Sequence, residues 1–167
     1  MLRRLISASL VGAFLAISVH VQSQTPVLRS GHTDTVNAIA VSPDGTTFAT
    51  GAADGTVIIW DVATGKLLRT IDPPEELKDP LGATRLFGIT GLAYSPTGQI
   101  LAVALRDGVI LIDSKTAKRL ALLQDAKAKS IASLEFSPDG RILATASNGF
   151  LSIEKEETLT LWDVAGR

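Results

Sequence analysis

The sequence contains no cysteine, two histidines and few aromatic residues. The absence of cysteine excludes disulfides and thiolate metal sites, and two histidines leave little material for a transition-metal site. The formal charge of −1, with no basic patch interleaved with aromatic residues, argues against nucleic-acid binding. No glycine-rich phosphate loop, nucleophile elbow or HExxH motif is present, so we predict a non-enzymatic protein without cofactor or metal.

The chain begins with the leader MLRRLISASLVGAFLAISVHVQSQ. Arg3 and Arg4 precede an apolar stretch from Leu5 to Val19, and Ser23 suits cleavage before Gln24. This order predicts a helical signal peptide over residues 1–23, and with it a secreted or periplasmic protein. The stretch is shorter than the roughly 20 apolar residues that span a bilayer, so a membrane anchor formed by an uncleaved signal is the alternative.

Three later segments are similar to one another: residues 35–71, 88–123 and 130–167. Each has an alternating apolar run that leads into a Ser-Pro-Asp/Thr-Gly turn, where proline presets φ and glycine accepts a positive φ. A second apolar run and a third run rich in β-branched residues follow, and the first two copies continue into a fourth run. Short strands separated by turns at this interval predict an all-β fold.

Gly31-His32, Trp60-Asp61 and Trp162-Asp163 stand at the positions that resemble the WD40 repeat of β-propellers. The resemblance covers nearly the whole of residues 24–167. It implies three four-stranded antiparallel blades that form an incomplete ring. The blades are expected at about residues 31–71, 88–123 and 130–167, with a strand of residues 25–30 completing the third.

In the WD40 family a histidine, a serine or threonine, an aspartate and the tryptophan form a buried hydrogen-bonded set within a blade. Here the resemblance implies His32, Thr50, Asp54 and Trp60 for this set, with Asp61, Trp162 and Asp163 as further blade markers. Buried polar groups need partners, so we interpret the set as structural. The alternative, His32 as a catalytic base oriented by Asp54, also requires a nucleophile.

The other two copies carry the set incompletely. The second copy has Val103 for the threonine and Ile112 for the tryptophan, although it retains Asp107. The third keeps Thr145 and Trp162 but lacks the preceding Gly-His pair. Joint replacement of polar partners by apolar groups can be nearly neutral, so these blades are expected to be stable.

The first strand of each copy has one bulky face and one small face, which suits a strand near a propeller axis, in a sheet covered on both sides. Glu135 breaks this pattern, and we interpret it as a strand-end carboxylate that faces water or the channel. The bulky face holds Ile39, Leu92 and Leu134, then Val41, Tyr94 and Phe136. The small face holds Ala38, Gly91 and Ser133, then Ala40, Ala93 and Glu135.

Two insertions interrupt the repeats, at residues 72–87 and 150–157. Function in such scaffolds resides on loops held by a rigid body, so both are candidate contact regions. The first is rich in proline and acidic residues and is expected to be stiff and solvated. In the second, Phe150 and Leu151 either tuck back or form a small apolar contact point.

Three blades are too few to close a ring, because propellers close with about four to eight. Two explanations stand: the sequence is a truncated product, or two or more copies assemble and complete a ring. The predicted function is that of an exported, non-catalytic scaffold that binds an unidentified protein. The alternatives are the propeller portion of a secreted enzyme, for which Glu135 and Asp107 are the candidate residues, and a fragment without independent function.

Overall fold

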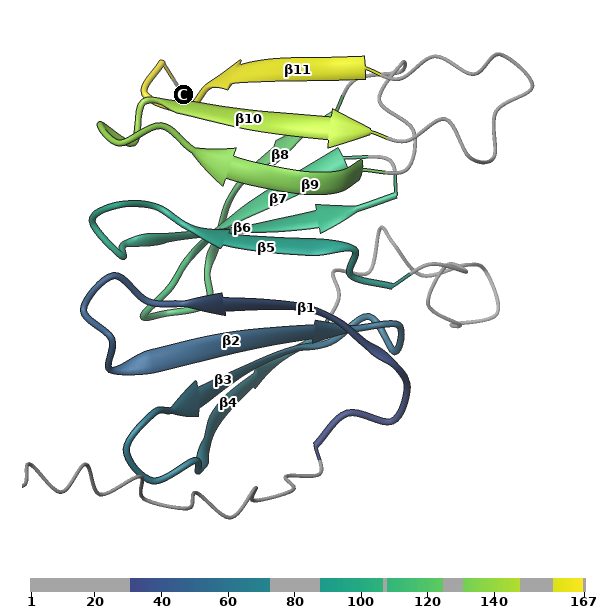
Figure 1. Ribbon diagram of the computed structural model, residues 1–167, viewed down its shortest axis with the longest axis vertical. Coiled ribbons are helices and arrows are strands. Elements are labelled where there is room, and N and C mark those ends of the chain that lie inside the picture. Colours follow the sequence, from purple (N-terminus) through teal and green to yellow (C-terminus); the bar gives the residue numbers. More distant parts are fainter. Residues whose placement is uncertain (1–30, 73–87, 107, 125–130, 148–157, 167) are drawn as a thin grey trace, which may run out of the picture.

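The computed structural model describes residues 31–72, 88–106, 108–124, 131–147 and 158–166. These residues form an all-β protein of three antiparallel sheets with four, four and three strands (Figure 1). The expected signal helix, the expected strand of residues 25–30 and nearly all of the two insertions lie outside the described residues. Three strands are therefore what the structure describes of the third sheet, where the sequence predicted four.

Each sheet is a simple meander in which neighbours in sequence are neighbours in space. The first sheet contains β1 (Val36–Val41), β2 (Thr47–Ala52), β3 (Val57–Asp61) and β4 (Leu67–Ile71). The second contains β5 (Gly91–Tyr94), β6 (Ile100–Leu105), β7 (Gly108–Asp113) and β8 (Arg119–Leu123). The third contains β9 (Ile131–Phe136), β10 (Ile142–Ser147) and β11 (Thr158–Asp163).

The turn between the first two strands has the same geometry in all three sheets. Gly45, Gly98 and Gly140 have φ values of 69°, 70° and 71°, a left-handed conformation that glycine adopts without strain. The amide of each glycine donates to the carbonyl of the serine that opens its turn, at 2.8 Å in every copy. The Ser-Pro-Asp/Thr-Gly motif therefore determines this local structure three times over.

Each sheet has two distinct faces, and the register assigns residues to them. We call the face that carries Ile39 and Val41 the leading face of the first sheet; Thr50 and Phe48 lie opposite them on β2. The face that carries Ala38 and Ala40 is its trailing face. In the second sheet, the leading face carries Leu92 and Tyr94, and the trailing face carries Gly91 and Ala93. In the third sheet, the leading face carries Leu134 and Phe136, and the trailing face carries Ser133 and Glu135.

The sheets stack so that a leading face packs on the trailing face of the preceding sheet. One core cluster joins the leading face of the second sheet, including Leu92 and Val103, to Ala49 and Val57 of the first. A second cluster joins Leu134 and others of the third sheet to the trailing face of the second. In the second and third sheets, the bulky side of the first strand is thus the side that packs on the preceding sheet, whereas the bulky side of β1 is exposed.

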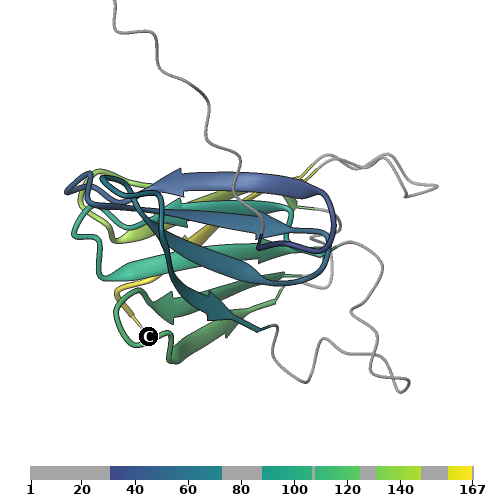
Figure 2. The same cartoon turned by 90° about the horizontal axis from the view of Figure 1, so that it is seen from below.

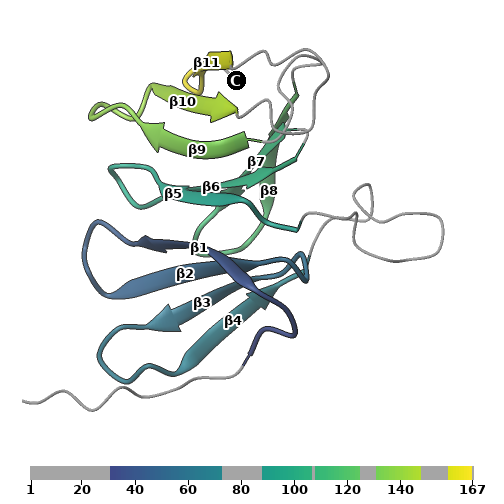
Figure 3. The same cartoon turned by 45° about the vertical axis from the view of Figure 1, so that its right-hand side comes forward.

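The stacking brings the innermost strands together, with β1 against β5 and β5 against β9. Figure 3 shows these three strands side by side, while β4 and β8 lie away from them. Seen from below, the first sheet lies in front of the other two (Figure 2). Close approach depends on Gly91, because a Cβ there would lie 2.6 Å from Leu134 Cδ2.

Candidate functional site

The first sheet brings together the four residues that the WD40 resemblance selected. His32 lies just before β1, Thr50 on β2, Asp54 in the turn before β3, and Trp60 on β3. The Trp60 indole donates to Thr50 Oγ1 at 2.7 Å, and Thr50 Oγ1 lies 2.8 Å from His32 Nε2. On the other side of the ring, His32 Nδ1 lies 3.3 Å from Asp54 Oδ2. The four side chains form one continuous chain of hydrogen bonds.

Two threonines extend this network, and sequence reasoning missed both. The Thr56 hydroxyl donates to Asp54 Oδ1 at 2.7 Å and lies 3.0 Å from His32 Nδ1. The Thr33 amide donates to Asp54 Oδ2 at 2.7 Å. The spacing of Asp54 and Thr56 was the available signal for the first, because an aspartate often bonds the backbone two residues on.

One tautomer of His32 satisfies every group in the network. With its proton on Nδ1, the ring donates toward Asp54 and Thr56, and its unprotonated Nε2 accepts the Thr50 hydroxyl proton. Thr50 Oγ1 then accepts from Trp60 while donating to His32. We assign this neutral tautomer from the partners.

The Asp54 carboxylate is strongly stabilised in its charged form. Burial alone would raise its pKa, but hydrogen bonds from the Thr56 hydroxyl and amide and from the Thr33 amide, together with His32, lower the pKa of Asp54 to about 2. The Asp54 side chain is 8% exposed and the His32 side chain 6%. The carboxylate therefore stays ionised and holds the loop before β1 against the β2–β3 turn.

The order Thr50, His32, Asp54 has the connectivity of a nucleophile, a base and an orienting carboxylate. Its surroundings oppose that role. Thr50 is only 9% exposed, and its oxygen already accepts the Trp60 N–H at 2.7 Å. A hydroxyl covered by the indole leaves no space for an electrophile near it, so the arrangement acts as a structural clamp.

The third sheet retains part of the same clamp. Trp162 Nε1 donates to Thr145 Oγ1 at 3.0 Å, and Thr145 is buried. In the second sheet, Val103 and Ile112 take the threonine and tryptophan positions and are both buried in the apolar core. Asp107, which the sequence offered as the aspartate of this copy, lies outside the described residues.

The aspartate that ends the third strand of each sheet caps a turn. Asp61 Oδ1 accepts from the Thr64 amide at 2.7 Å, and Asp163 Oδ1 accepts from the Ala165 amide at 3.0 Å. Asp113 does the same with the Thr116 amide at 2.7 Å, although no tryptophan precedes it. Hydrogen bonds from Thr64 and Thr116 lower the pKa values of Asp61 and Asp113. Sequence reasoning missed Asp113 because it searched for the Trp-Asp dipeptide, and the residue before Asp113 is isoleucine.

Two end faces, the leading face of the first sheet and the trailing face of the third, expose large apolar side chains. Ile39 and Val41 are 66% and 58% exposed, whereas Leu92 and Leu134 at the position of Ile39 are 8% and 7% exposed. Leu159 and Leu161 on β11 are 73% and 64% exposed. At the position of Leu159, the first and second sheets have Val57 and Val109. At the position of Leu161, they have Ile59 and Leu111, and all four of these residues are buried.

Glu135 lies on the exposed trailing face of the third sheet, opposite Ala144 of β10. It occupies the position of Ala40 and Ala93, and its side chain is exposed to water. Asp107, the other residue considered for an enzyme, lies outside the described residues. Among the described residues, no three His, Asp or Glu side chains gather in a way that could hold a metal ion. Nor does any helix in the described part of the chain reach the length and apolarity needed to cross a membrane.

Comparison with known proteins identifies similar sequences. The profile described as "WD domain, G-beta repeat" matches residues 23–61, and that of the "Anaphase-promoting complex subunit 4 WD40 domain" matches residues 92–164. The small ribosomal subunit protein RACK1y of Oryza sativa subsp. japonica is 33% identical over 145 residues, which cover 81% of this chain and 37% of the relative. A guanine nucleotide-binding protein subunit beta of Solanum tuberosum is 31% identical over 121 residues, 70% of this chain and 30% of the relative. The chain thus spans about a third of the length of these relatives.

Proposed function

Because this chain belongs to the WD40-repeat family, we propose that it acts as a non-catalytic scaffold for protein–protein interactions through its two exposed end faces. The partner is another sheet of the same repeat, supplied by a second copy that joins head to tail. The observation that carries this proposal is the exposure of Ile39, Val41, Leu159 and Leu161 at positions that the internal sheet contacts bury. Both relatives are named as subunits of larger assemblies, which agrees with an interaction role.

The two end faces are the two halves of one repeated contact. Inside the molecule, a leading face always packs on a trailing face. The leading face of the first sheet is uncovered at Ile39 and Val41, although Ile58 and Trp60 on the same face are buried. The trailing face of the third sheet is uncovered at Leu159 and Leu161, so one copy presents both surfaces that a head-to-tail contact needs. Such a contact is heterologous, and it closes into a ring when the rotation between copies allows it.

The turns at one rim support the same pairing. A Cβ on Gly98 would lie 3.4 Å from Pro43 of the preceding sheet, and one on Gly140 would lie 3.4 Å from Pro96. A Cβ on Gly45 would have nothing within 4 Å. In the proposed contact, Pro138 of one copy packs against Gly45 of the next and continues this series.

Closing a ring allows the free energy gained by burying these few side chains to exceed the cost of association. Full burial of an aliphatic side chain of this size contributes about 1.5–3 kcal/mol, and association costs an estimated 4–15 kcal/mol in lost translational and rotational freedom. Two copies closed into a ring form two contacts for one association cost. Six sheets also lie within the range of about four to eight blades in which propellers close.

The experiment measures the mass of the purified chain by light scattering after size exclusion, over a range of concentrations. We expect a discrete dimer, and we expect Ile39→Asp and Leu161→Asp each to give monomers, because a buried unpaired carboxylate is strongly unfavourable. A matched control is Leu120→Asp on β8, which is exposed but lies outside both end faces.

Mixing the two variants distinguishes a head-to-tail contact from any symmetric one. Ile39→Asp keeps an intact trailing face and Leu161→Asp an intact leading face, so the mixture forms one sound contact and recovers a weaker dimer. A wild-type monomer that unfolds cooperatively would refute the proposal. So would a dimer that both variants retain.

We propose in addition that the chain is exported. The support is the leader of residues 1–23, in which Arg3 and Arg4 precede the apolar stretch. N-terminal sequencing of the expressed chain from the extracytoplasmic fraction tests this, with Gln24 expected as the first residue. Recovery of the intact chain with membranes would instead support the uncleaved anchor, and an intact soluble chain in the cytoplasm would refute export.

A further inference from the structure

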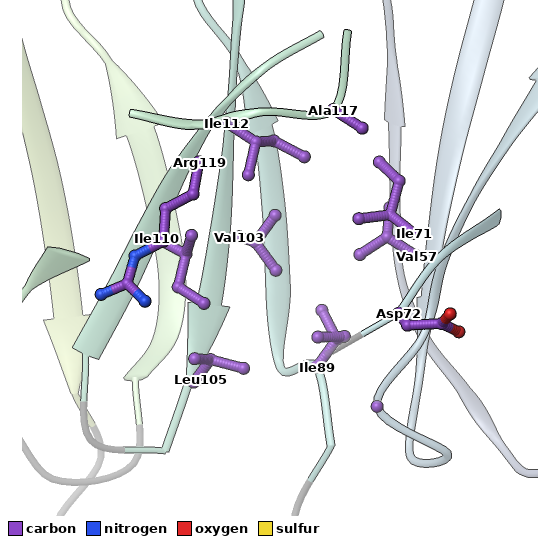
Figure 4. A pocket seen from close by; sticks show the side chains of 11 residues that line it. Val57, Ile71, Asp72, Ile89, Val103, Leu105, Ile110, Ile112, Ala117 and Arg119 are labelled. Atoms are coloured by element: carbon purple, nitrogen blue, oxygen red, sulfur yellow. The ribbon is translucent and has the colours of Figure 1, made fainter. Parts of the chain in front are cut away.

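A cavity of ≈ 200 Å³ lies between the first and second sheets. Its described lining is almost entirely aliphatic, with Val57 and Ile71 on one wall and Val103, Ile110 and Ile112 on the other. Asp72 and Arg119 also contribute to the lining. Figure 4 shows the Asp72 carboxylate and the Arg119 guanidinium turned away from the space between the sheets, so the interior is apolar.

The cavity lies where the second sheet lacks its tryptophan. On the first sheet, the same face carries Trp60 beside Ile58, with the indole bonded to Thr50. The register places Ile112, Ile110 and Val103 at these three positions of the second sheet. Replacing an indole by the smaller isoleucine side chain leaves a ring-sized volume unfilled. Replacing threonine by valine removes the acceptor that held the indole N–H.

We propose that this cavity is a binding site for a small, uncharged aromatic molecule that has no hydrogen-bond donor. An apolar protein cavity of about 150 Å³ is large enough to bind benzene and stays free of water. A flat one- or two-ring molecule therefore fits the space. A donor on the ring would be buried beside Val103 without an acceptor, which costs affinity.

The experiment compares indene and indole, which have the same shape and differ in one N–H group. Each is titrated into the purified full chain by calorimetry, with thermal unfolding as a second readout. We expect indene to bind and to raise the unfolding temperature. We expect indole to bind about tenfold more weakly, as a buried donor without a partner requires.

Two variants test the position of the ligand. Ile112→Trp places an indole in the cavity from the protein itself, so indene binding should be lost. Val103→Thr restores the acceptor that Thr50 provides on the first sheet, and it should move the preference toward indole. The matched control is Leu120→Trp, which adds the same side chain at an exposed position on β8 outside the cavity lining and both end faces, and it should leave indene binding unchanged.

If Ile112→Trp fails to fold, Val103→Leu removes part of the same volume more gently and should weaken indene binding severalfold. Failure of the wild-type chain to bind indene would overturn the proposal. Equal binding by wild type and by a folded Ile112→Trp variant would also overturn it, as would loss of binding in Leu120→Trp. These last two results would place the ligand outside the cavity.

Discussion

Replacing Asp54 with asparagine removes the charge at the centre of the clamp in the first sheet and keeps the side-chain shape. The carboxylate accepts from Thr56, Thr33 and His32, and an asparagine has one acceptor oxygen where the aspartate has two. The folded pKa is about 2 and the model-peptide value is 3.8. At about 1.4 kcal/mol per pKa unit, this difference corresponds to about 2 kcal/mol of stability from the charged form.

The pH dependence has a definite sign. Because folding lowers the pKa of Asp54, its contribution is fully present above about pH 4 and is lost as the pH falls through 2. The wild-type chain should therefore exceed Asp54→Asn by about 2 kcal/mol in unfolding free energy at pH 7. The difference should shrink toward zero in acid, where both side chains are uncharged.

Urea unfolding followed by tryptophan fluorescence measures both chains at each pH. Comparing the two chains isolates Asp54 from the other carboxylates of lowered pKa, such as Asp44 and Asp139. Asp139→Asn is the matched control: this exposed turn residue accepts from Ser137 and Arg141 and does not contact the clamp. Because solvent screens an exposed carboxylate, Asp139→Asn should differ from wild type by less than Asp54→Asn does at pH 7. A difference between wild type and Asp54→Asn that stays constant from pH 7 to pH 2 would refute the assignment.

Five other substitutions have expected outcomes. Ala117 has a φ of 61°, a left-handed conformation that costs a non-glycine residue about 1–2 kcal/mol. Glycine removes this cost but loses more entropy on folding, so Ala117→Gly should raise the unfolding free energy by roughly 0.5–1 kcal/mol. Gly65→Ala, at a φ of 63°, should lower it in the same chemical denaturation assay. The Thr90 hydroxyl is buried with no hydrogen-bond partner among the residues that the structure describes, so Thr90→Val should be stabilising by about 1 kcal/mol in thermal unfolding. Thr145→Val should be destabilising, because the Trp162 indole loses its acceptor. Glu135→Ala restores the alanine of the other sheets to the trailing face and should tighten self-association in sedimentation velocity; unchanged association would place Glu135 outside the contact.

Local patterns predicted most of the described strands and turns. The Ser-Pro-Asp/Thr-Gly motif and the period-two alternation depend on neighbours in sequence. The second apolar runs predicted from the sequence start at Phe48, Leu101 and Leu143, and β2, β6 and β10 begin one residue before them. The clamp of His32, Thr50, Asp54 and Trp60 came from the family resemblance, and the structure brings those side chains within hydrogen-bond distance.

Other features depend on contacts that no local pattern encodes. Ala117 takes a left-handed conformation because its turn corresponds to the turn of the first sheet that contains Gly65. An alanine in the sequence does not by itself predict such a conformation. The direction in which each bulky face packs is set by the neighbouring sheet. The cavity depends on two differences from the first sheet, Val103 in place of threonine and Ile112 in place of tryptophan, and on an apolar wall of that first sheet. Neither difference on its own predicts a cavity.

The fixed order of leading on trailing faces also makes folding directional. Each sheet hydrogen-bonds within itself, and its leading face requires only the trailing face of the sheet before it. During synthesis from the N-terminus, the first sheet is complete before the second emerges, so each new sheet finds its docking surface already formed. Turning one sheet over would instead pair two leading faces, bulky against bulky. The polarity of the packing thus fixes which way round each repeat must join its neighbour.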